Sequence, residues 1–233
     1  MDNKKMEGAG MRSTPFLIVW VLAVVWSRAH GASNLVVNGS FDHPDDPLYG
    51  WRYKYDREGE SWYFNNHEHV QVVEEFAGRK KVLALWGDYA ILQVPGQGTK
   101  VDSFPIPVEK GARYRLTVTA RTTGPSSRIL AEGYQWRPGI RPHPNPEWHE
   151  LRKCYKSELI YFGKDEGGTM SSPSRSNWET ASVLFPPASP TPLAKNILAK
   201  MEFVVIHIVA IGGSEGTLYV DDVRLEKVSD SKP

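Results

Sequence analysis

The sequence has almost no cysteine and no strong charge of one sign. Among its 233 residues Cys154 is the single cysteine, so no disulfide can form within the chain. The formal net charge is +1, and no basic run occurs outside the first residues. Proteins that bind nucleic acid or anionic membranes need a basic patch. Both classes are therefore disfavoured, and a neutral partner is expected.

A long hydrophobic run is also missing. The apolar stretch Phe16 to Trp26 falls well short of the roughly 20 residues that a membrane-spanning helix needs. It follows three basic residues and precedes the small residues of Ala29-His30-Gly31, which is the pattern of a cleaved export signal. We therefore expect a signal peptide over residues 1–32 and a secreted, periplasmic or cell-surface protein without a stable membrane span. An uncleaved anchor is the alternative.

Aromatic residues, in contrast, are abundant. The chain has eight Trp and ten Tyr against a hydrophobic fraction of 40%, which indicates that some rings serve as binding groups at the surface. The roughly 200 residues after the leader can bury a core as one domain. We expect this domain over residues 33–229, followed by a polar, frayed tail over 230–233.

Short segments rich in Val, Ile, Leu and Tyr dominate this domain. Clusters of Gly, Pro or Ser separate them, which is typical of an antiparallel β-sandwich. The alternation is clearest where Tyr114, Leu116 and Val118 share one face and arginines and threonines share the other. The segments that we expect as strands are 69–76, 80–87, 113–122, 127–136, 179–185, 201–210 and 217–226.

Two segments interrupt this pattern. Asn145 can cap a helix, a proline follows it, and Trp148, Leu151 and Tyr155 recur at helical spacing, so a short helix is expected in this inserted loop. The segment 186–200 begins as a proline-rich loop and is expected to end in one helical turn.

The two ends of the domain resemble those of a known family. The first strand, NLVVNGSFD at 34–42, and the last, GTLYVDDVRLE at 216–226, are similar to the terminal signatures of CenC-type carbohydrate-binding modules, which are attached to many xylanases, cellulases and laminarinases. Gly50-Trp51, VLALWG, FPIPVEKGARYRLTVTARTT and NWETASVLFPP lie between them in the family's order. The resemblance spans most of the mature chain, and it implies the two-sheet jelly roll of the galactose-binding-like class.

The resemblance also implies a structural calcium ion. A jelly roll brings its first and last strands together, so Asp42, Asp221 and Asp222 could converge on one hard cation whose shell backbone carbonyls complete. The alternation along LYVDDV leaves open which of the two neighbouring acids faces the site. Alternatively, these acids simply solvate a loop and a strand end.

The family binds glycans on its concave sheet face, and a suitable set of side chains occurs around residue 135. Sugar rings stack on aromatic faces, while amides and guanidinium groups bind the hydroxyls. Tyr134, Gln135, Trp136 and Arg137 offer this combination, and Trp148 follows in an Arg- and Pro-rich insertion that could close the groove. Because alternate residues face opposite sides, we expect the Tyr134 and Trp136 pair to line the groove. The alternative is a small loop core made by Trp136 and Trp148.

A second cluster of rings surrounds a charged turn. Tyr53, Tyr55 and Trp62 belong to it and form a second candidate binding rim, with packing at an edge strand as the alternative. Trp51 and Trp178 are expected to pack in the core instead.

No pattern in the sequence demands catalysis. His67, His69 and Glu74 imitate the first metal-binding motif of cupins, but the matching second motif has no histidine. Several carboxylates could serve a glycoside hydrolase, but the sequence does not give their separation. We therefore expect a non-catalytic module that binds a polysaccharide or oligosaccharide. A surface adhesion or protein-interaction domain is the second hypothesis, and a cupin-like metal enzyme or glycoside hydrolase is the third.

Overall fold

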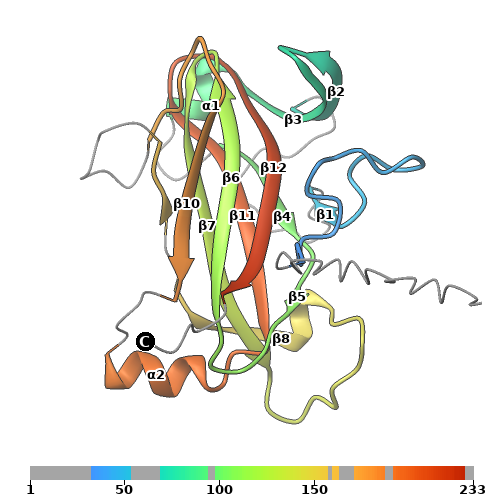
Figure 1. Cartoon of the computed structure of the whole chain (residues 1–233), viewed down its shortest axis with the longest axis vertical. Helices are drawn as coiled ribbons and strands as arrows, with labels where there is room; N and C mark the ends of the chain where they lie inside the picture. Colours follow the sequence, from blue (N-terminus) through green and yellow to red (C-terminus); the bar gives the residue numbers. More distant parts are fainter. Residues whose placement is uncertain are drawn as a thin grey trace, which may run out of the picture. The chain divides into compact units, whose positions relative to one another are not determined.

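The segments with alternating apolar residues form two antiparallel sheets (Figure 1). The strands of the first sheet are β1 (Trp51–Arg52), β4 (Thr99–Ser103), β5 (Ile106–Pro107), β7 (Pro125–Trp136), β8 (Leu151–Tyr155), β9 (Leu159–Ile160) and β11 (Phe203–Gly213). Their order is β1-β4-β11-β7-β8, with β5 paired to β11 and β9 paired to β7. The strands of the second sheet are β2 (Val70–Phe76), β3 (Arg79–Gly87), β6 (Arg113–Thr122), β10 (Glu179–Phe185) and β12 (Gly216–Val228), in the order β10-β6-β12-β3-β2.

The computed structural model describes residues 33–53, 69–93, 98–156, 159–162, 171–186 and 191–228. The chain divides after Gly31 into two compact units, and the described residues all belong to the second. The predicted signal peptide and tail lie outside the described residues, as do Tyr55, Trp62 and His67. No helix in the described part is long and apolar enough to cross a membrane.

The apolar faces of the two sheets pack against each other. Leu116 and Val118 of β6 are fully buried, as the alternation predicts, and Val204, Ile206 and Ile208 of β11 oppose them in one core. Removing each such side chain from water contributes about 1.5–3 kcal/mol. The predicted all-β, two-sheet antiparallel sandwich is confirmed.

The helices lie at the two ends of the sandwich (Figure 1). The short helix α1 (Tyr89–Gln93) follows β3, and α2 (Pro192–Leu198) lies at the other end. Thr191 caps α2 by accepting a hydrogen bond from the backbone N of Ala194. The helix is seven residues long and therefore exceeds the single turn that we expected.

The helix predicted in the insertion is wrong beyond its first turn. Trp148–Glu150 forms one 3-10 turn, and Leu151–Tyr155 continues as β8. Residues of β8 pair with β7, with Trp136 opposite Leu151 and Tyr134 opposite Lys153. The backbone hydrogen bonds to an existing strand therefore override the helical spacing of the apolar residues.

The N-terminal segment 34–42 is also not a strand, although it lies beside β12 as predicted. Positive φ angles at Asn38 (52°) and Phe41 (56°) break its extended course. The backbone N of Leu35 donates to Leu225 O, and the backbone N of Val223 donates to Gly39 O, both at 2.9 Å. A side chain at Gly39 would place its Cβ 2.0 Å from Val223 O, so this close approach requires glycine.

The acidic pair Asp221 and Asp222 lies at a bulge in β12. The register with β6 shifts between Asp221 and Arg224, and Asp222 has a φ of 50°. The extra residue lets both Val220 and Val223 point into the core, where both are fully buried. Asp221 and Asp222 therefore occupy a special backbone position whether or not they bind a ligand.

Candidate functional site

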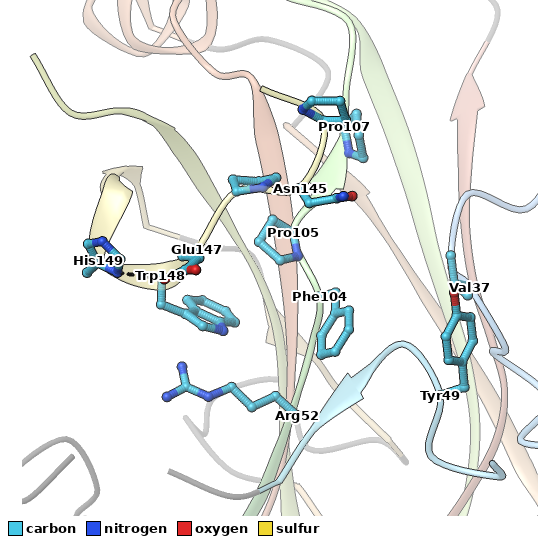
Figure 2. A pocket seen from close by; sticks show the side chains of 12 residues that line it. Val37, Tyr49, Arg52, Phe104, Pro105, Pro107, Asn145, Glu147, Trp148 and His149 are labelled. Carbon is cyan, nitrogen blue, oxygen red and sulfur yellow. Dashed lines mark ion pairs between the residues drawn. The ribbon is translucent and has the colours of Figure 1, made fainter. Parts of the chain in front are cut away.

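A groove of about 680 Å³ opens between three segments that are far apart in the sequence. Figure 2 shows its side chains, which come from the N-terminal segment, the stretch between β4 and β5, and the insertion. We call it the aromatic groove. Its lining residues are Val37, Tyr49, Arg52, Phe104, Pro105, Pro107, Pro144, Asn145, Pro146, Glu147, Trp148 and His149.

Backbone hydrogen bonds assemble this groove. Gly50 adopts a φ of 84°, which favours glycine, and its carbonyl accepts a hydrogen bond of 2.8 Å from the backbone N of Phe104. Strand β1 then pairs with β4, so that Arg52 lies opposite Asp102. The backbone N of Arg137 donates to Glu150 O at 2.8 Å. This bond joins the two ends of the insertion that carries Trp148.

Several apolar side chains of the groove are exposed to solvent. Val37, Tyr49 and Phe104 are 53%, 50% and 52% exposed. Figure 2 shows the Phe104 ring between Trp148 on one side and Tyr49 on the other. Soluble proteins rarely leave such a group of large apolar side chains uncovered without a use for it.

Contacts from two neighbouring side chains hold the ring of Trp148. Its side chain is half-buried, the Arg52 guanidinium lies 5.1 Å from its ring centroid, and the Tyr134 ring meets it edge-to-face at 6.0 Å. These cation–π and aromatic contacts fix the orientation of the indole.

The insertion is braced from within and forms one wall of the groove. His143 Nε2 lies 2.9 and 3.0 Å from the two carboxylate oxygens of Glu150, and the His143 ring lies 5.1 Å from Trp136. Glu150 also accepts a hydrogen bond from the backbone N of Glu147, and this bond, followed by that from His143, lowers the pKa of Glu150. The Arg- and Pro-rich loop is thus an ordered wall that leaves the groove open.

A smaller hollow of about 300 Å³ lies on the outer face of the first sheet. It adjoins the aromatic groove because Tyr134 lines the hollow while touching Trp148. We call it the charged hollow. Its lining residues are Lys100, Arg128, Leu130, Glu132, Tyr134, Lys153, Lys156, His207 and Val209.

A buried histidine bridges two carboxylates at the floor of the hollow. His207 Nδ1 lies 2.6 Å from Asp102 Oδ1, and Nε2 lies 3.2 Å from Glu132 Oε2, at an angle outside hydrogen-bond geometry. All three residues are less than 10% exposed. Lys100 pairs with Asp102 at 3.1 Å, and Lys153 pairs with Glu132 at 2.6 Å.

The network determines the protonation of its members. Burial alone would raise the pKa of Glu132, but the close contact and positive charge of His207, with the hydrogen bond and charge of Lys153, lower it to about 2. Burial would lower the pKa of His207, yet Asp102 and Glu132 raise it above the usual 6.5. Burial and the negative charge of Glu132 raise the pKa of Tyr134, whose hydroxyl donates to Glu132 Oε2 at 3.0 Å. Glu132 therefore stays ionised, and Tyr134 stays neutral.

The strand alternation places the predicted aromatic pair together. Tyr134 lines the charged hollow, and Trp136 shares its side of β7, where its ring contacts Phe203 at 5.3 Å. Gln135 lines a different pocket. Arg137 is exposed and donates to Leu151 O. Whether these residues bind a ligand stays a prediction.

The other predicted tryptophans and tyrosines divide between core and surface. Trp51 is 4% exposed and contacts Phe41 at 5.3 Å, so its assignment to the core is confirmed. Trp178 packs edge-on against Phe76. Tyr53 is half-buried and packs against the core, as the edge-strand alternative expected.

The three acids of the expected calcium site do not all line one pocket in the described structure. Among the residues that the structure describes, no group of three or more His, Cys, Asp or Glu side chains could hold a metal ion. Asp42 and Asp222 line one pocket, but Asp221 accepts a hydrogen bond of 2.8 Å from Arg79, which also pairs with Asp222. The arginine supplies positive charge where the calcium was expected. A calcium ion held by fewer side chains stays a prediction.

The residues named in the enzyme hypotheses have other contacts. The His69 ring stacks on Trp86 at 5.0 Å, and the exposed Glu74 pairs with Lys81 at 3.6 Å. Burial raises the pKa of the Cys154 thiol, which is the opposite of what a nucleophile needs.

Sequence reasoning missed Tyr49, Arg52 and Phe104. Phe104 stands directly before Pro105, which has no N–H to donate to a ladder, and this was the one local sign of a ring outside the core. Nothing local shows that Tyr49 and Phe104 come to lie beside Trp148.

No family model and no curated protein matches this chain. Solved structures to which it is similar include a Family 16 Carbohydrate Binding Module-2 (TM-score 0.47, 14% identity, 82% of this chain and 99% of that one). TmCBM61 in complex with β-1,4-galactotriose has a TM-score of 0.44 and 12% identity over 84% of this chain and 100% of that one. The N-terminal cellulose-binding domain from Cellulomonas fimi β-1,4-glucanase C has a TM-score of 0.43 and 18% identity over 85% and 99%. Values this low do not assign the chain to the family of any of these proteins.

Proposed function

We propose that this protein binds a saccharide chain, without transforming it, in the aromatic groove. The observation that carries the proposal is the set of exposed flat rings, Tyr49 and Phe104, beside the fixed indole of Trp148. Sugar rings present patches of C–H that stack on such faces. The exported location indicated by the leader is part of the same proposal, because polysaccharides occur outside the cell.

The polar residues of the groove supply the second requirement of sugar recognition. Asn145, Glu147 and His149 belong to the wall opposite Tyr49 and line the groove with Arg52. Amide, carboxylate, imidazole and guanidinium groups together offer both donors and acceptors for hydroxyls. The volume of about 680 Å³ falls within the usual 300–1,000 Å³ of ligand sites.

Retention on insoluble polysaccharides and a glycan array test this proposal. We expect the wild type to bind at least one glycan, and Phe104→Ala and Trp148→Ala to weaken that binding about tenfold or more, because each removes a stacking surface. The matched control is Tyr89→Ala, which removes a 65% exposed ring of α1 that does not line the groove.

Two outcomes would contradict the proposal. One is a wild-type protein that binds no glycan on either platform. The other is an equal loss in Tyr89→Ala, which would show that the rings act only through general surface hydrophobicity. A protein partner captured by the wild type and released by Phe104→Ala would instead favour the adhesion hypothesis, which the exposed prolines of the groove also suit.

A further inference from the structure

We infer that the charged hollow binds an anionic group of the saccharide, either the carboxylate of a uronic acid or a sulfate ester. The inference rests on the proposed function, because the hollow adjoins the aromatic groove through the contact between Tyr134 and Trp148. A saccharide whose rings stack in the groove can then place a substituent in the hollow.

The hollow has more cationic than anionic side chains. Two carboxylates belong to the network, and each is already engaged. Asp102 contacts Lys100 and His207, while Glu132 contacts Lys153 and His207. Arg128 and Lys156 also line the hollow, and no carboxylate partner of either is found among the described residues. A net positive potential therefore remains for a ligand.

Arg128 carries the most specific sign of a missing partner. Its Nε atom is buried and has no hydrogen-bond partner in the described part of the protein. Such an unsatisfied donor is costly and rare in a folded protein. Because this atom has almost no accessible surface, a ligand oxygen reaches it only if the Arg128 side chain moves. The planar guanidinium fork fits carboxylate and sulfate groups in a way that no neutral hydroxyl matches.

The sheet register places a second cation across from Arg128. Val209 of β11 lies opposite Arg128 of β7 on one side and opposite Lys100 of β4 on the other. The three residues form one row on the outer face, with two positive side chains flanking a small apolar one. An anion seated over Val209 would meet positive charge from both sides.

Neighbouring contacts hold the floor of the hollow in a fixed arrangement. His207 is oriented by Asp102 at 2.6 Å, and Tyr134 donates to Glu132. These contacts fix the positions of His207 and Tyr134 before a ligand arrives, although His207 Nε2 has no hydrogen-bond partner in the described part of the protein. The affinity of the ligand is expected to depend mainly on Arg128 and Lys156.

Calorimetric titration with paired ligands tests the inference. The acidic probes are oligogalacturonate, oligoguluronate and oligomannuronate, each compared with its methyl-esterified form, and a sulfated galactan oligosaccharide, compared with the unsulfated one. We expect at least one acidic probe to bind tenfold or more tightly than its neutral form, with an affinity that falls as salt is raised. A carboxylate source and a sulfate source are distinguished by which pair shows the preference.

Variants then locate the effect. Arg128→Gln is expected to weaken the acidic probe at least tenfold while changing the neutral form less than twofold, and Lys156→Gln to act in the same direction. Arg115→Gln, which removes the same charge from an exposed position on β6 of the other sheet, should leave both affinities unchanged.

The failures of the two proposals are distinguishable. Equal binding of acidic and neutral forms, or an equal loss in Arg128→Gln and Arg115→Gln, overturns the inference and leaves saccharide binding in the groove intact. Absence of binding by every probe and every glycan overturns both.

Discussion

Replacement of Trp51 by alanine is expected to lower the free energy of unfolding by about 3–5 kcal/mol. Trp51 is 4% exposed, its ring contacts Phe41, and its Nε1 donates to the backbone O of Asn38 at 3.1 Å. The change removes a large buried ring and its hydrogen bond, and it leaves a cavity where the N-terminal segment joins the first sheet. Urea unfolding followed by circular dichroism measures the loss.

Trp148→Ala is the matched control for this experiment. It removes the same side chain from a half-buried position on the 3-10 turn, so we expect a loss of about 1.5 kcal/mol or less. Equal losses in the two variants would show that Trp51 does not anchor the N-terminal segment to the core.

Replacement of His207 by leucine is expected to cost about 3–5 kcal/mol. The change leaves the Asp102 and Glu132 carboxylates buried without the imidazolium that bridges them, although each still pairs with a lysine. Lys153→Met removes another partner of Glu132, but the Lys153 side chain is 48% exposed. Its loss should be about 1 kcal/mol or less because solvent screens the pair.

The same network predicts how stability depends on pH. The pKa of Glu132 falls from 4.5 to about 2 on folding, so its contribution, about 3 kcal/mol, is complete above pH 4.5 and is lost as the pH falls toward 2. The pKa of His207 rises above 6.5, so its contribution is complete below pH 6.5 and is lost as the pH rises through the raised value. The network is therefore strongest between pH 4.5 and 6.5.

The free energy of unfolding of the wild type and of His207→Leu, measured below, within and above pH 4.5–6.5, tests that dependence. The difference in stability between them should be largest between pH 4.5 and 6.5 and should shrink on both sides. A difference that does not change with pH would show that the histidine acts only by filling space.

The strands could be predicted from sequence because their faces differ in local polarity. The predicted segments 113–122 and 179–185 match β6 and β10 to the residue. The short strands β4 and β8 were missed, because β4 has buried polar residues such as Asp102 and β8 has apolar residues that also fit a helix. Pairing with neighbouring strands, rather than local preference, decides their conformation.

The candidate site could be predicted only in part. Period-two alternation correctly placed Tyr134 and Trp136 on one face. The charged network joins Asp102, Glu132 and His207 from three strands, and the groove joins three distant segments. Neither has a local pattern that would reveal it. The contact of Arg79 with the acidic pair at 221 and 222 also has no local sign, because Arg79 is more than a hundred residues away in the sequence.

Saccharide binding in the aromatic groove can be seen directly in a crystal structure of the protein with an oligosaccharide that it retains. We expect a sugar ring in van der Waals contact with the ring face of Phe104, Tyr49 or Trp148 inside the groove. A sugar bound at another surface, with the groove empty, would contradict it.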